Sequence, residues 1–238
     1  MFHTIFYQPL YNLLVWLAGI SGGNLGLSVI ILTLVVKIIL SPLAHRASHS
    51  QRTNQSKMAD IQEKIKEIQK KHKDSKEAQG RATLELYKAH GFNPLTSFLL
   101  VLIQLPVLFA IYQVVRVGLP FNSSELYSFV AAPLLVSPVF LGINLLEKSV
   151  LLAILVAVTQ FIQMKLAIPP TAKNSSKPDS MQAHFAQSMQ FNMRYVMPLV
   201  IGFISLSFPA ALSLYWTVNN LFTIGHEMIV KRQVDKLK

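Results

Sequence analysis

The chain has 238 residues, of which 52% are hydrophobic and only 14% are charged, and its mean hydropathy is +0.41. Soluble domains carry about 25% charged residues, so this composition excludes an ordinary soluble protein and indicates an all-α polytopic membrane protein. The formal net charge of +11 would suit nucleic-acid binding. However, eleven of the 22 Lys and Arg residues fall between Arg46 and Lys88, and one cytoplasmic loop of a membrane protein explains that cluster. The chain has no cysteine, which excludes disulfides, thiolate sites and cysteine-linked lipids.

The first segment, residues 1–20, is apolar and rich in the aromatic residues that favour membrane interfaces. Pro9 interrupts it, and it lacks the basic start and the cleavage site of a signal peptide. We expect an amphipathic helix that lies at the outer interface of the membrane. A membrane-spanning helix is the less favoured alternative, because only residues 21–24 separate this segment from the next apolar run and the charge distribution would then be reversed.

Five later stretches have the apolar composition of membrane-spanning helices. In chain order, the predicted spans are 25–43, 94–117, 148–167, 191–208 and 210–229. The segments between and after them are a cytoplasmic segment 44–92, an external segment 118–147 with a short interfacial helix, a cytoplasmic loop 168–190 and a basic cytoplasmic tail 230–238. Under this count the basic loops and the tail lie on the same side. The sequence therefore predicts a multi-pass protein of the plasma or inner membrane, with its N-terminus outside and its C-terminus in the cytoplasm.

The cytoplasmic segment 44–92 is predicted to form a helical hairpin. Apolar side chains recur at helical spacing in two stretches, which the polar turn 72–77 separates. A plain connector needs only a few residues, so we interpret the hairpin as a docking or recruitment element. A solvated helical pair that only connects two spans is the simpler alternative. The candidate recruitment residues are Met58, Ile61, Ile65, Leu84 and Tyr87.

Lys37 is the only charged residue in the apolar run from Gly26 to Leu43. A charge at the centre of a spanning helix costs at least about 2.5–3.5 kcal/mol, so a partner, water or a substrate must compensate it. The first four predicted spans hold no acidic residue, and Glu227 near the inner end of the fifth is the only acidic candidate nearby. We therefore expect Lys37 to face hydrated polar space. Snorkelling to the cytoplasmic headgroups is the alternative.

Other predicted spans also carry polar residues at helical spacing, and each one taken alone is most simply an interhelical hydrogen bond. The chain has no HExxH, GxSxG or P-loop motif, so no enzymatic activity and no cofactor is expected. His45 and His49 lie four residues apart, which could suit a metal on a helix. In a basic stretch without an acidic neighbour, a solvated face is the simpler interpretation, so no metal site is expected.

Three motifs together resemble the YidC family of membrane protein insertases. They are Tyr87-Lys88 followed by Asn93-Pro94-Leu95, the stretch IQLPVLFAIY at 103–112, and FPAALSLYWTVNNL at 208–221. The resemblance extends over nearly the whole chain, in the short form without a large external domain. It implies five core helices around a hydrophilic groove that is open to the cytoplasm and the lipid but closed to the outside.

The family resemblance also assigns residues to that groove. Lys37 matches an intramembrane basic residue that is usually arginine in the family, so the charge is kept here while the planar donor fork of arginine is lost. The other matched groove positions are Thr33, Gln104, Gln163, Trp216, Thr217 and Asn220.

The resemblance implies an insertase that helps nascent membrane proteins to enter the bilayer and fold, without nucleotide hydrolysis, metal or cofactor. The implied partners are nascent membrane proteins and the lipid bilayer, with the Sec translocon and the ribosome as further candidates. No specific nucleic-acid sequence and no small-molecule substrate is implied. Two alternatives remain from the residues alone: a channel or transporter with an anion site at Lys37, and a non-catalytic membrane assembly factor.

Overall fold

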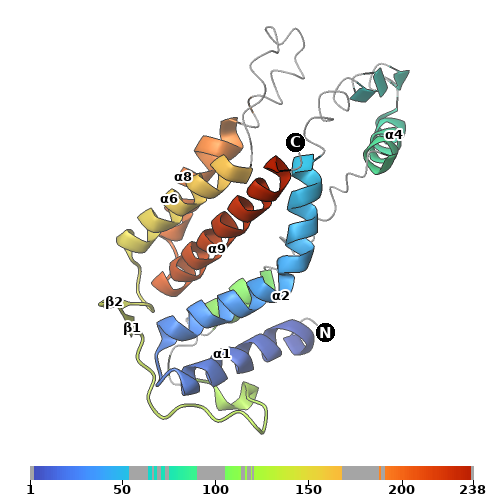
Figure 1. Ribbon diagram of the computed structural model, residues 1–238. Coiled ribbons are helices and arrows are strands. Elements are labelled where there is room, and N and C mark those ends of the chain that lie inside the picture. The colour runs from blue at the N-terminus through green and yellow to red at the C-terminus, as the bar shows by residue number, and fades with distance from the viewer. Residues whose placement is uncertain are drawn as a thin grey trace. The chain divides into compact units, whose positions relative to one another are not determined.

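A computed structural model describes residues 3–53, 75–89, 105–113, 121–167 and 191–236, together with residues 64–65, 67–68, 71–72, 116, 119 and 188. These parts of the chain are mainly helical (Figure 1), in agreement with the predicted helical membrane protein. The chain divides into two compact units. The first comprises Met1–Ile39 and Leu105–Glu227, and the second comprises Leu40–Gln104 and Met228–Lys238.

The N-terminal part of the first unit consists of the π-helix η1 (His3–Tyr7) and the helix α1 (Gln8–Ile20). Pro9 lies in the first turn of α1, where the π-helix η1 passes directly into α1, and it does not end the helical stretch. Asn12 is buried on α1, where its side-chain oxygen accepts a hydrogen bond from the backbone N–H of Tyr127 at 2.7 Å. Its amide group donates to the carbonyl of Glu125 at 2.9 Å. These bonds hold the segment around Glu125 against α1.

Helix α2 (Leu25–Thr53) begins in the first unit and continues into the second. Pro42, predicted to lie at the inner end of a span, is inside this helix and does not end it. Membrane-spanning helices tolerate an interior proline where neighbouring groups satisfy the backbone carbonyl that it leaves free.

The described part of the segment predicted to be external, residues 121–147, contains a β-hairpin where the sequence predicted a short interfacial helix, so the prediction of a helix is wrong there. The 3-10 helix η2 (Ser123–Glu125) is followed by the antiparallel strands β1 (Val139–Phe140) and β2 (Ile143–Asn144). Leu141 and Gly142 both have positive φ, 50° and 80°, which is the backbone of a tight two-residue hairpin turn. Local apolarity suggested a helix, but the prolines of this segment and the positive φ angles at its turn disfavour one.

The remaining helices of the first unit follow the hairpin. They are α6 (Val150–Ala167), η3 (Asn192–Val196), α8 (Met197–Ser205) and α9 (Ala210–Asp235), the last of which extends into the second unit. Helices α6 and α8 pack side by side (Figure 1). At their contact, a Cβ atom on Gly202 would lie 2.6 Å from the Cβ of Ala157. Small residues permit this close approach of two helices, as they do between helices in membranes.

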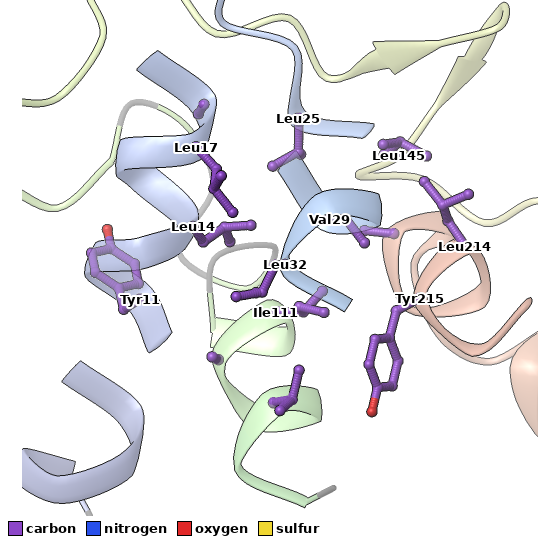
Figure 2. Packing of buried hydrophobic residues seen from close by; sticks show 14 of the residues in the cluster. Tyr11, Leu14, Leu17, Leu25, Val29, Leu32, Ile111, Leu145, Leu214 and Tyr215 are labelled. Carbon is purple, nitrogen blue, oxygen red and sulfur yellow. The ribbon is translucent and has the colours of Figure 1, made fainter. Parts of the chain in front are cut away.

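Buried apolar side chains of α1, α2, residues 105–113 and α9 form most of the core of the first unit, and Leu152 of α6 also belongs to it. Figure 2 shows them turned toward one another: Tyr11, Leu14 and Leu17 of α1, Leu25, Val29 and Leu32 of α2, Ile111 of the helical residues 105–113, and Leu214 and Tyr215 of α9, with Leu145 beside them. The core thus joins α1 to the helices that the sequence assigns to the membrane.

Helix α6 has an exposed face that is more apolar than its buried face. Val150, Leu151 and Ile154 are exposed, whereas Thr159 and Gln160 are buried. A helix in water would show the reverse pattern, so this surface suits hydrocarbon. Among the described residues, two helical stretches are long and apolar enough to cross a membrane, Leu25–His49 and Val150–Ala167. The other three predicted spans stay predictions.

The second unit contains helix α4 (Lys76–Ala89). The hydroxyl of Ser75 accepts a hydrogen bond from the N–H of Ala78 at 3.2 Å, which caps the first turn of this helix. Glu77 and Arg81 form an ion pair at 2.8 Å, but both side chains are largely exposed, so the pair contributes little to stability.

Candidate functional site

Lys37 of α2 contacts α9 within the first unit. Its Nζ donates a hydrogen bond to Oγ1 of Thr223 at 3.3 Å, although the two residues are 186 positions apart in the chain. The hydroxyl of Thr223 in turn donates to the carbonyl oxygen of Asn219 at 2.8 Å. The Thr223 hydroxyl therefore accepts a hydrogen bond from the ammonium group and donates one to the backbone, so it acts as acceptor and donor at the same time. One turn further along α9, Glu227 is buried.

Further hydrogen bonds lead from this point to α6. The side-chain amide of Asn219 lies 3.4 Å from Oδ1 of Asn220, and Nδ2 of Asn220 donates to Oγ1 of Thr159 at 3.1 Å. Thr159 donates to the carbonyl of Leu155 at 2.7 Å. Asn219, Asn220 and Thr159 are all buried. A series of polar contacts thus links Lys37 on α2, through α9, to α6.

The other predicted groove residues differ in their surroundings. Thr33 and Thr217 are buried, and each donates its hydroxyl to the backbone carbonyl four residues earlier, at 2.6 and 2.8 Å. Trp216 is half-buried on α9. The Oε1 atom of Gln163 on α6 is buried without a hydrogen-bond partner among the described residues. Gln104 lies outside the described residues, and the assignment of all these positions to a groove stays a prediction.

Thr223 and Thr159 were not among the predicted groove positions. Thr223 lies three and four residues after Asn220 and Asn219, so it shares their face of α9. That spacing is the signal from which Thr223 could have been included. No local pattern indicates that its partner is Lys37, since that contact depends on how two distant helices pack.

The predicted recruitment residues lie in the second unit, where the structure describes only part of them. Met58 and Ile61 fall outside the described residues, whereas Ile65 is half-buried in a helical stretch. Leu84 and Tyr87 belong to α4. The recruitment role of the hairpin therefore stays a prediction.

The histidine pair considered as a metal site lies on α2, where the ring centroids of His45 and His49 are 6.2 Å apart. Among the described residues, no group of three or more His, Asp or Glu side chains is placed to hold a metal ion. The groups near Lys37 are instead neutral hydroxyls and amides, together with the buried carboxyl group of Glu227 one turn beyond Thr223 on α9. Such groups can attract and hydrogen-bond a polar or acidic segment.

Comparison with known proteins identifies similar chains. The family described as 60Kd inner membrane protein matches residues 16–237. A protein named Membrane protein insertase YidC from Wolinella succinogenes is 32% identical over 237 residues, which cover 100% of this chain and 39% of the relative. The protein of that name from Oceanobacillus iheyensis is 32% identical over 236 residues, covering 98% of this chain and 84% of the relative. For a third, from a Geobacter species, the identity is 30%, with 90% of this chain and 34% of the relative covered. The chain thus spans well under half the length of two of these relatives and most of the length of the other.

Proposed function

Because the chain belongs to the 60Kd inner membrane protein family, we propose that it is a membrane protein insertase of the inner membrane. The observation that carries this proposal is the match over nearly the whole chain, and it agrees with the resemblance to YidC insertases that the motifs around 87–95, 103–112 and 208–221 indicate. The name of the relatives from Wolinella and Oceanobacillus, Membrane protein insertase YidC, supports the same activity.

The proposed mechanism follows from the cost of polar groups in lipid. An unsatisfied backbone N–H or C=O in hydrocarbon costs several kcal/mol, so a hydrophilic segment crosses the bilayer slowly unless it finds partners on the way. A hydrophilic groove between the predicted spans would supply water and polar side chains part-way across. The apolar part of the substrate then moves sideways into lipid, driven by the hydrophobic effect. This step requires neither nucleotide nor metal.

Lys37 is the proposed electrostatic element of that groove. Its ammonium group attracts the acidic or polar flank of the incoming segment. The hydrogen bond to Thr223 supports this role, because it draws the ammonium toward α9, a helix with several polar side chains, while snorkelling would carry it to the headgroups. The buried Oε1 of Gln163 has no hydrogen-bond partner among the residues that the structure describes, so it is a candidate acceptor for a substrate N–H group. Since lysine lacks the planar donor fork of arginine, charge contributes more here than bidentate geometry.

The proposed partners and topology follow from the same activity. Nascent membrane proteins are the substrates, and the lipid bilayer receives them. The hairpin 44–92 recruits substrate on the cytoplasmic side, while the N-terminus lies outside. The Sec translocon and the ribosome are further candidate partners. The basic tail 230–238 would attract ribosomal RNA phosphates in a salt-dependent way.

A reconstitution experiment tests the insertase activity. The full chain is incorporated into vesicles, and a single-span substrate with a short acidic N-terminal flank is synthesised in their presence. Protease protection of the flank then measures its translocation. We expect the wild-type chain and Lys37→Arg to protect the flank and Lys37→Ala to protect it several-fold less. Selective solute flux without protection would instead indicate a channel, and full protection by Lys37→Ala would refute the charge-attraction mechanism.

Crosslinking to a stalled nascent chain tests the groove itself. Photoreactive probes at positions 33, 104 and 216 should react with a substrate whose apolar segment has partly entered the membrane. A matched probe at Ile154, which lies on the exposed apolar face of α6, should react mainly with lipid. Equal crosslinking of the substrate at position 154 and at the three groove positions would contradict a defined groove.

A further inference from the structure

The external segment exposes large apolar side chains to an unusual degree. Leu134 is 100% exposed, Leu141 is 86% exposed, and Leu135 and Phe129 exceed 80%. The whole stretch 126–146 contains no charged residue. Soluble proteins rarely expose so many large apolar side chains in one short segment, and large exposed apolar patches mark interaction sites.

The backbone bonds of this segment show that these side chains are not exposed merely because the loop is loose. The N–H of Ser137 donates to the carbonyl of Gly23 at 2.8 Å, and the N–H of Leu25 donates to the carbonyl of Ser137 at 3.1 Å. The N–H of Leu145 donates to the carbonyl of Pro138 at 2.9 Å. Phe140 packs against the core and would meet any side chain placed at Gly26. The segment is thus fixed at several points, with one set of apolar side chains turned inward and another turned outward.

Leu141 provides a second, independent observation. It has a φ of 50° at the first turn position of the β1–β2 hairpin, a conformation that side chains other than Gly, Asn and Asp rarely adopt. In this turn an asparagine would fit the backbone better. Because the leucine side chain is exposed, packing against the described residues does not explain a leucine at this strained position, whereas a contact outside the chain would.

The residues around these exposed side chains favour lipid as what covers them. The first turns of α6 begin within nine residues of Leu141, and their exposed Val150, Leu151 and Ile154 continue the apolar surface. The stretch 148–167, which contains α6, is one of the predicted spans, and its N-terminal end must reach a membrane surface. A charge-free patch beside that end suits the boundary of headgroups and acyl chains.

We propose that the β1–β2 hairpin and the preceding loop form a lipid-inserted anchor, in which Phe129, Leu134, Leu135 and Leu141 enter the leaflet at the N-terminal end of α6. The anchor requires that α6 crosses the membrane, and it does not depend on insertase activity. It holds the external segment, and through Ser137 the turn between α1 and α2, at a fixed depth in the membrane.

The absence of native cysteine makes a direct depth measurement feasible. Single cysteines at positions 134 and 141 are labelled with an environment-sensitive fluorophore in the full chain. The protein is placed in nanodiscs of phosphatidylethanolamine and phosphatidylglycerol. Labels at Ile154 and Lys236 serve as the lipid and water controls. We expect brominated lipid to reduce fluorescence at 134 and 141 several-fold, as at 154, and aqueous iodide to quench only position 236 strongly.

Two outcomes would overturn the anchor. If iodide reaches positions 134 and 141 as readily as position 236, the hairpin lies in water. If both quenchers fail at those positions and the protection varies with the number of protein copies per disc, a protein covers the patch instead of lipid.

The substitution Leu141→Asn provides a matched variant, because it keeps the backbone of the turn. It should leave the thermal midpoint unchanged or raise it, while reducing brominated-lipid quenching of the label at position 134. A fall in the thermal midpoint would show that Leu141 packs within the protein, and the proposal would then be wrong.

Discussion

Replacing Gly202 by alanine tests how closely α6 and α8 pack. The added Cβ would lie 2.6 Å from the Cβ of Ala157 and 3.5 Å from the carbonyl oxygen of Ala153. Carbon atoms in contact are ordinarily about 3.5–4.0 Å apart, so the two helices must separate by about 1 Å or shift sideways. Overpacking of this kind costs about 1–3 kcal/mol. Alanine regains about 0.8–1.0 kcal/mol through its higher helix propensity, so we expect a net loss of about 1 kcal/mol.

Gly225 on α9 provides the matched control. It is a helical glycine, and a Cβ added there would have no neighbouring atom within 4 Å, so Gly225→Ala gains helix propensity without a clash. Both variants gain the same helix propensity, so it cancels when they are compared. The difference in their free energies of unfolding should therefore report the cost of the steric clash alone, about 1–3 kcal/mol. Equilibrium unfolding in mixed micelles, followed by far-UV circular dichroism, measures both values.

A double-mutant cycle identifies the clashing partner. Ala157→Gly removes the Cβ that alanine at position 202 would meet, so the double variant should be more stable than the sum of the single changes predicts, by about 1 kcal/mol or more. Strict additivity, or a Gly202→Ala variant as stable as Gly225→Ala, would show that α6 and α8 do not approach as closely as the structure has them.

Two further predictions concern polar contacts. Thr223→Val removes the hydroxyl that Lys37 contacts at 3.3 Å and should slow substrate insertion by about two- to tenfold, since one such bond contributes about 0.5–1.5 kcal/mol. Ser28→Ala removes a buried hydroxyl outside the predicted groove, which donates to the carbonyl of Asn24. It should have a smaller effect, and equal effects would argue against a positioning role for Thr223. Asn12→Ala leaves the backbone N–H of Tyr127 without its side-chain acceptor and should cost about 1–3 kcal/mol locally. Hydrogen–deuterium exchange at the Tyr127 amide should accelerate, and unchanged exchange would show that Asn12 does not hold residues 125–127 against α1.

Composition and charge determined much about this protein without any structure. The apolar runs, the scarcity of charge and the basic cluster between Arg46 and Lys88 predicted a helical membrane protein, because the transfer of each residue to lipid depends mainly on its own chemistry and that of its neighbours. The motif resemblance predicted the family, and the match over residues 16–237 confirms it. The isolated charge of Lys37 was likewise evident from the sequence.

Residues 121–147, which the sequence predicted to be external, show where local reasoning failed. Their apolar stretch suggested an interfacial helix, whereas the structure has the hairpin of β1 and β2 there. The conformation depends on a positive φ at Leu141 and on the bonds of Ser137 to Gly23 and Leu25, which are distant in sequence. Hydropathy reports how apolar a segment is, and it carries no information about such long-range backbone pairing.

Only the tertiary structure decided which polar groups meet. The sequence placed Lys37 on one helix and Thr223 on another, and no pattern within either helix predicts their hydrogen bond. The same holds for Asn220 and Thr159, whose contact joins α9 to α6. Helical periodicity assigns a side chain to a face of its own helix, but the neighbour of that face is set by how the apolar cores and small residues let the helices pack.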